Sequence, residues 1–164
     1  LLPPGRGMAA DGIPFTGFLY AGLMIDNDGS VKTLEFNCRM GDPETQPILM
    51  RLKSDFVDLL EHGIDGTLDE VEAEWDRRVA LGVVLAAANY PDTPKKGDII
   101  HGLPAGNSFD KDGQVVTAGG RVLCVTALGE NIKLAQRRAY EAAAQIAWDG
   151  MQFRTDIGHR AIGR

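Results

Sequence analysis

The sequence predicts an α+β fold, in which strands pair into antiparallel hairpins and helices follow them in separate segments. Three observations support this class. Residues 16–25 are mostly apolar and lead through a turn sequence into a second strand-like stretch. Residues 79–128 hold several short apolar stretches separated by glycine, proline and asparagine, and residues 130–148 form one long segment of helical composition.

The first expected hairpin covers residues 17–37. Its first strand lies within residues 16–25, whose aromatic and branched side chains suit a buried strand. Asp26-Asn27-Asp28-Gly29 is a turn cluster, because asparagine and glycine tolerate positive φ. The second strand, residues 31–37, carries β-branched and apolar side chains and ends among polar residues.

Polar side chains gather at the end of this second strand. Side chains alternate between faces along a strand, so Glu35, Asn37 and Arg39 are expected to point the same way, and Cys38 toward a core. A carboxylate and an amide oxygen suit Mg²⁺, which takes few ligands from protein and completes its shell with phosphate and water. Arginine can hold a phosphoryl oxygen. The row indicates a metal–nucleotide site or, by spacing alone, a solvated strand edge running into a turn.

Two helices are expected after the strand. Asp42 can cap the first helix, with Pro43 in its first turn, but a further proline favours a start near Thr45. Ser54 is the expected N-cap of the second helix, whose apolar stripe ends near Gly63.

Residues 65–74 form an acidic segment. We expect it to be a solvated linker or helix surface between two domains. The chain has a net charge of −6 and no basic stripe, which argues against nucleic-acid binding. No apolar run is long enough to predict a membrane span, and a cytoplasmic protein is expected. Two cysteines, Cys38 and Cys124, do not make a disulfide framework.

The remaining elements are expected in the second domain. Residues 79–88 predict a buried strand, and residues 98–101 and 114–117 predict short strands. Residues 121–128 are expected to return as the hairpin partner of residues 114–117, after a glycine turn. The amphipathic segment of residues 130–148 predicts a helix packed on the sheet.

A longer string of residues resembles the metal-binding hairpin of ATP-grasp enzymes, in particular that of the phosphoribosylamine–glycine ligase family. The family pattern, an arginine followed closely by Gly-Asp-Pro-Glu and then glutamine, is matched by Arg39, Gly41, Asp42, Pro43, Glu44 and Gln46. The similarity continues over nearly the whole chain, including Leu81-Gly82-Val83-Val84, His101-Gly102-Leu103, residues 115–129 and Asp156-Ile157-Gly158.

The resemblance implies a domain organisation. Residues 1–70 would be the C-terminal part of an ATP-grasp domain, and residues 75–164 a small, mostly antiparallel β-sheet domain with one long helix. An N-terminal domain and a nucleotide-clamping subdomain of the family are not visible in this sequence. We therefore expect the chain to be the C-terminal part of a longer enzyme, which would supply these subdomains as partners.

The resemblance also implies a reaction, in which ATP drives the ligation of glycine to 5-phosphoribosylamine through a glycyl phosphate. Glu35 and Asn37 would bind the Mg²⁺ or Mn²⁺ that bridges the ATP phosphates, so that Asn37 also belongs to the nucleotide site. Arg39 would be the catalytic residue that stabilises the transferred phosphoryl group or the acyl phosphate. Asp42 and Glu44 would contact substrate or serve only to cap the helix.

Two departures from the family pattern stand out. Gly22 occupies the position at which many ATP-grasp ligases carry a third, acidic metal ligand, so Glu35 and Asn37 must suffice with water and phosphate. The segment of residues 103–114 is short and lacks the family's His-Ala-Gly-Thr stretch, so either the protein has lost that loop or the sequence omits residues there. Two alternatives stay open: another ATP-grasp carboxylate–amine ligase, and a non-catalytic scaffold fragment.

Overall fold

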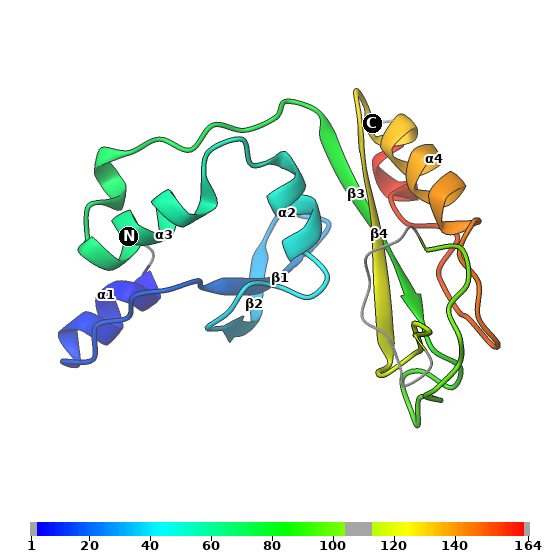
Figure 1. Ribbon diagram of the computed structural model, residues 1–164. Helices are drawn as coiled ribbons and strands as arrows, with labels where there is room; N and C mark the ends of the chain where they lie inside the picture. Colours follow the sequence, from blue (N-terminus) through cyan, green and yellow to red (C-terminus); the bar gives the residue numbers. More distant parts are fainter. Residues whose placement is uncertain (1–2, 104–112, 163–164) are drawn as a thin grey trace. The chain divides into compact units, whose positions relative to one another are not determined.

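The computed structural model of the chain describes residues 3–103 and 113–162 (Figure 1). Contacts group them into two compact units, and each unit is described by itself. The first unit comprises the residues through Asp42 together with Leu52–Trp75, and the second comprises Pro43–Arg51 together with the residues from Asp76 onward. The short predicted segment at residues 103–114 lies largely outside the described residues. The predicted domain division at residues 1–70 and 75–164 stays a prediction.

The first unit contains the predicted hairpin. Helix α1, Pro3–Ala10, precedes strand β1, Tyr20–Ile25, which pairs antiparallel with β2, Val31–Asn37. The turn between the strands is closed by hydrogen bonds from the amide of Asp26 to the carbonyl of Ser30 (2.9 Å) and from the amide of Gly29 to the carbonyl of Asp26 (3.0 Å). Gly29 has φ of +84°, as the turn chemistry predicts.

The hairpin carries a β-bulge that the sequence analysis did not predict. Gly22 pairs with Glu35, but the next residue, Leu23, pairs with Thr33, so Leu34 is an extra residue on β2. The expectation of a buried strand at residues 16–25 is wrong for this chain. Leu23, Met24 and Ile25 are exposed, and so are Leu34 and Phe36, because among the described residues of the first unit no helix packs extensively on the hairpin.

Helix α3, Phe56–Asp65, is followed by the short 3₁₀ helix η1, Leu68–Glu70. Its N-cap is Asp55, whose carboxylate accepts from the amides of Val57 and Asp58, so the expected cap at Ser54 is wrong by one residue. The Ser54 hydroxyl instead accepts the amide of Glu74 at 2.7 Å. The helix runs past Gly63 and ends where Gly66 takes the left-handed conformation, with φ of +75°.

The second unit is built on two long antiparallel strands, β3, Val79–Ala86, and β4, Arg121–Gly129 (Figure 1). Helix α4, Ile132–Ala143, packs on one face. Its alanines are buried with alternate residues of β3, in a core that consists of Leu81, Val83, Leu85, Ala135, Ala139, Ala143, Ile100 and Trp148.

Helix α2, Thr45–Arg51, packs on the same pair of strands and begins where the sequence predicts. A Cβ on Gly82 would come within 3.2 Å of the Pro47 ring and 2.8 Å of the Cys124 sulfur, so only glycine allows this close approach. The guanidinium of Arg51 donates twice to the carbonyl of Asp76, at 3.2 and 3.1 Å, and joins the end of α2 to the segment before β3.

The predicted partner of β4 is wrong. β4 pairs with β3 along its length, whereas the short strands expected at residues 98–101 and 114–117 form only isolated bridges, Ile99 to Val116 and His101 to Ala147. Two long apolar strands of matched length form more ladder hydrogen bonds and bury more side chains than a long strand paired with a four-residue one. Closeness in sequence across a glycine turn was therefore a misleading indicator of which strand pairs with β4.

Helix α4 is shorter than the predicted residues 130–148. Asn131 caps its start by accepting the amide of Leu134 at 2.9 Å, and the helix ends at Ala143. Beyond it, Ala147 exchanges two backbone hydrogen bonds with His101, and Trp148 enters the core. Tertiary pairing thus overrides helix propensity in this segment.

Cys38, expected in a core, is exposed because β2 ends at Asn37 and the chain bends there. Cys124 is partly buried. Every helix in the described parts of the chain is too short or too polar to span a lipid bilayer.

Candidate functional site

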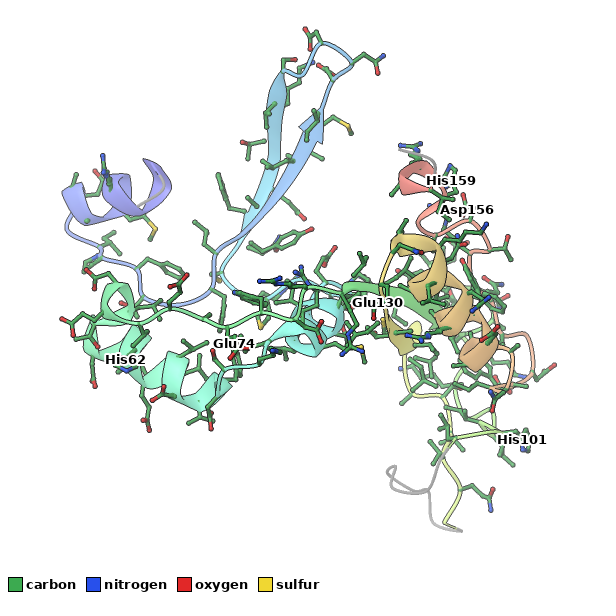
Figure 2. The ribbon with its side chains drawn as sticks, turned by 90° about the horizontal axis from the view of Figure 1, so that it is seen from above. His62, Glu74, His101, Glu130, Asp156 and His159 are labelled. Carbon is green, nitrogen blue, oxygen red and sulfur yellow. The ribbon has the colours of Figure 1, made fainter. Side chains whose placement is uncertain are left out.

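The candidate site lies at the end of β2. The last three pairs of the hairpin, from Gly22–Glu35 to Tyr20–Asn37, are regular, so Glu35 and Asn37 are two residues apart without an interruption. Their side chains therefore share one face of the hairpin. Glu35 is exposed and Asn37 is half-buried. Figure 2 shows that side chains stand on both sides of this hairpin, drawn in blue.

Arg39 lies beyond the strand, in the bend that follows it. Its Nη2 lies 3.5 Å from the Asn37 Oδ1, and its Nη1 donates to the carbonyl oxygen of Met40 at 2.9 Å. The bend thus brings the guanidinium back to the amide oxygen that the sequence analysis assigns to a metal. A carboxylate, an amide oxygen and a cation thus occur within five residues of chain, and the amide oxygen and the cation lie in contact.

The two oxygen donors fit a hard divalent cation that takes the rest of its ligands from outside the protein. Within residues 3–103 and 113–162, no group of three or more histidine, cysteine, aspartate or glutamate side chains is arranged to hold a metal. Gly22, across from Glu35, supplies no side-chain donor. Mg²⁺ is usually bound through one or two protein groups plus phosphate and water. Glu35 and Asn37 match that pattern.

The other two predicted site residues lie in the turn before α2. Asp42 is exposed and Glu44 is half-buried. The carbonyl of Glu44 accepts the amide of Ile48 at 3.2 Å, in the first turn of the helix. Asp42 is grouped with the first unit and Glu44 with the second. The turn therefore links the hairpin end to α2.

Sequence reasoning missed the bulge next to the site, although a signal exists. The apolar or β-branched residues Val31 and Thr33 stand at odd-numbered positions of β2, whereas Leu34 and Phe36 stand at even-numbered positions. This change of phase falls where the register shifts and Leu34 becomes the extra residue. The bulge precedes Glu35, so it leaves the Glu35–Asn37 spacing intact.

A charged cluster in the second unit has a structural role. The Lys95 ammonium lies 2.6 Å from Asp98 and 2.7 Å from Asp149, and so joins two segments distant in sequence. Its hydrogen bonds, first to Asp149 and then to Asp98, raise the pKa of Lys95 above its ordinary value. The same contact lowers the pKa of Asp149. These groups hold the loop after β3 to the segment after α4.

Comparison with known families gives two matches along the chain. The family described as phosphoribosylglycinamide synthetase, ATP-grasp (A) domain, matches residues 3–45, and the phosphoribosylglycinamide synthetase C domain matches residues 80–160. The first match contains β1, β2 and every predicted site residue. The second contains β4, α4 and all of β3 except its first residue, Val79.

Three proteins illustrate the similarity. A phosphoribosylamine–glycine ligase of Ralstonia nicotianae is 62% identical over 174 residues, which cover 100% of this chain and 41% of that protein. One of Neisseria meningitidis serogroup B is 58% identical, with the same coverage. The crystal structure of phosphoribosylamine–glycine ligase from Thermotoga maritima has a TM-score of 0.78 and 41% identity, covering 93% of this chain and 39% of that one.

The hairpin, the A-domain match and the similarity to the Thermotoga structure define the class: this chain contains an ATP-grasp portion. It belongs to the phosphoribosylamine–glycine ligase (phosphoribosylglycinamide synthetase) family. The chain spans about two fifths of the length of the curated relatives it matches, 41% in the Ralstonia protein. The alignment with that relative covers 174 residues, ten more than the 164 of this chain.

Proposed function

We propose that this chain works as part of an enzyme that joins glycine to 5-phosphoribosylamine at the expense of ATP, in purine biosynthesis and in the cytoplasm. Residues 1–70 would belong to its ATP-grasp domain, and residues 75–164 would form the accessory domain. One observation carries the proposal. Glu35 and Asn37 share a face at the end of β2, and the Arg39 guanidinium lies 3.5 Å from the Asn37 amide oxygen. Membership of the ligase family supports this interpretation.

The chemistry requires an activated carboxylate, because the carboxylate of glycine does not react with amines at neutral pH. Transfer of the terminal phosphoryl group of ATP to a glycine oxygen gives glycyl phosphate and ADP. The amine of the sugar then attacks the carbonyl carbon, and phosphate leaves as the C–N bond forms. The protein has to position these groups and neutralise their charge.

Glu35 and Asn37 would hold one Mg²⁺ or Mn²⁺ through a carboxylate oxygen and an amide oxygen. When bound, this ion supplies charge neutralisation on the ATP phosphates. Arg39 is placed to donate to a phosphoryl oxygen next to the same ligand set, and its planar fork suits that acceptor. Glu35 and Asn37 therefore fix where the phosphates lie, and Arg39 stabilises the group in transfer.

Asp42 and Glu44 are proposed to contact the substrates through their carboxylates. Both glycine and phosphoribosylamine carry an amino group. When this amino group is protonated, an ionised acidic side chain can bind it. The exposure of Asp42 supports such a role. Glu44 is also part of the turn that starts α2, so its substitution would combine a structural effect with a binding effect.

The partners of the chain are proposed to be the remaining segments of the same ligase, which would supply the N-terminal domain and the nucleotide clamp. Large apolar side chains of the hairpin are exposed, including Leu23 at 51% and Leu34 at 64%. Exposed apolar patches of this kind are typical of surfaces that another segment covers. The coverage of 41% of a relative's length is consistent with this organisation.

The proposal is tested by ADP release from the full-length protein that carries this chain, with glycine and phosphoribosylamine supplied together or singly. We expect release to need both substrates and to fall about 100-fold in Glu35→Gln, which keeps the side-chain shape but loses its charge. Glu61→Gln, at an exposed glutamate of α3, is the matched control and should turn over normally. Release without the sugar amine, or with a different amine in its place, would point to another ATP-grasp ligase.

A further inference from the structure

Gly22 faces Glu35 across the hairpin, and their approach is close. A Cβ added to Gly22 would lie 3.1 Å from the Glu35 Cγ. Its next neighbours would be the backbone oxygen and nitrogen of the same residue, at 3.7 and 3.8 Å. The Glu35 side chain therefore lies over the space that a residue with a side chain at position 22 would fill.

The backbone at Gly22 does not itself require glycine. Gly22 does not have a positive φ, so alanine can take its conformation without strain. The register directly opposite Glu35 is also regular. The one feature that distinguishes glycine here is the absence of a Cβ beside Glu35.

Burial does little to restrict the Glu35 side chain. Glu35 is exposed, and the residue before it, Leu34, is the bulged residue and is itself 64% exposed. An exposed glutamate with several rotatable bonds turns readily between rotamers. The residue across the strand pair therefore has a large share in setting the direction of its carboxylate.

From this geometry we propose that Gly22 is a positioning residue for the divalent cation: its missing side chain lets Glu35 lie across β1, with its carboxylate on the face it shares with Asn37. The inference rests on the proposed metal role of Glu35. A methyl group at position 22 would displace the Cγ by a few tenths of an ångström, and the carboxylate at the end of the side chain would move further. Gly22 thus acts through Glu35 and is not itself a ligand.

The test measures Mn²⁺ binding to the full-length protein, by electron paramagnetic resonance with a non-hydrolysable ATP analogue present. We expect Gly22→Ala to weaken Mn²⁺ binding about 10-fold, the lower range for residues that orient a metal ligand. The Mg²⁺ concentration for half-maximal rate should rise by a similar factor, while kcat at saturating Mg²⁺ stays within about 2-fold of wild type. Gly63→Ala is the matched control, because a Cβ there meets no atom within 4 Å and Gly63 has ordinary helical φ.

A double-mutant cycle shows whether the effect passes through Glu35. Glu35→Ala removes both the Cγ and the carboxylate, so Gly22→Ala should cause no additional loss of Mn²⁺ affinity in that background. Unchanged binding in Gly22→Ala, or an equal further loss in the Glu35→Ala background, would overturn the positioning role. Unchanged binding in Glu35→Ala alone would overturn the proposed metal site itself, and the inference with it.

Circular dichroism supplies the second readout in case Gly22→Ala fails to fold. If the contact with the Glu35 Cγ is the cause, the double variant with Glu35→Ala should recover the unfolding midpoint of Glu35→Ala alone. Failure to fold in both backgrounds would show that the Cβ acts elsewhere, and would contradict the inference.

Discussion

The Nη2 of Arg39 lies 3.5 Å from the Oδ1 of Asn37, the amide oxygen proposed as a metal ligand. A cation bound at this oxygen and the guanidinium would repel each other unless anionic oxygens lay between them. Phosphate groups provide such oxygens. We therefore expect Arg39 and the metal to bind the phosphates of the same nucleotide. Substitution of Arg39 should then have a different effect from substitution of Asn37.

Arg39→Ala should therefore lower kcat without weakening the metal site. We expect a loss of about 10²–10³ in kcat, as for removal of one donor to a developing charge, with Mn²⁺ affinity in the absence of nucleotide equal to wild type or higher. Arg39→Lys keeps the charge but loses the planar fork, and should recover only part of the rate. Mn²⁺ binding that falls with kcat in Arg39→Ala would contradict this division of roles.

The chain by itself should not catalyse the ligation. Within the described residues the end of β2 offers two proposed metal ligands and one arginine, and large apolar side chains of the hairpin are exposed. We expect the 164-residue chain to release no ADP above the enzyme-free blank, even with all substrates and Mg²⁺. Ligation by the isolated chain, verified by mass spectrometry of the product, would show that the site is complete without other segments.

Tyr140→Phe should loosen the C-terminal segment from α4. The Tyr140 hydroxyl donates to the carbonyl of Arg154 at 2.7 Å and accepts the amide of Ile157 at 3.1 Å. Removal of the hydroxyl takes away both hydrogen bonds, so the free energy of unfolding should fall by about 1–2 kcal/mol. Urea denaturation measures this change. An unchanged midpoint would mean that water replaces the hydroxyl at no cost.

The ion pair of Lys95 with Asp149 should make part of the stability dependent on pH. Contact with Lys95 holds the pKa of Asp149 below its ordinary 3.8. The pair's contribution is therefore present above about pH 3.8 and is lost as the pH falls through the lowered pKa of the folded state. The effect should be small, because both side chains are solvent-exposed and screened.

Asp149→Asn should accordingly lower the thermal midpoint slightly at pH 7, and the difference from wild type should vanish in strong acid. Asp92→Asn, at an exposed aspartate of the loop after β3, is the matched control and should follow the wild-type profile. A difference between Asp149→Asn and wild type that persisted in strong acid would show that the substitution acts through something other than this charge.

Local signals in the sequence predicted the hairpin of residues 17–37, the start of α2 and the same-face placement of Glu35 and Asn37. These features depend on turn chemistry, proline and strand alternation, which act over a few residues. The partner of β4 was not predicted correctly, because strand pairing depends on the whole second unit and β3 lies far back in the sequence. The shortened α4 has the same origin.

The candidate site, like the fold, could be predicted only in part from the sequence. Residue types and spacing indicated either a metal site or a solvated strand edge, and the family resemblance then favoured Glu35 and Asn37 as ligands, which stays a prediction. The space at Gly22 and the return of Arg39 to Asn37 depend on cross-strand distances and on the bend after β2, which no residue pattern contains. The roles of Asp42 and Glu44 stay predictions.

The central claim is that the end of β2 holds the metal that carries the nucleotide, and the most direct test is the dissociation constant of Mn²⁺ in the full-length protein. We expect Glu35→Gln to weaken Mn²⁺ binding about 10- to 100-fold in the presence of a non-hydrolysable ATP analogue, while Glu61→Gln binds as wild type does. Wild-type Mn²⁺ affinity in Glu35→Gln would contradict the claim, and the site would have to be sought elsewhere in the protein.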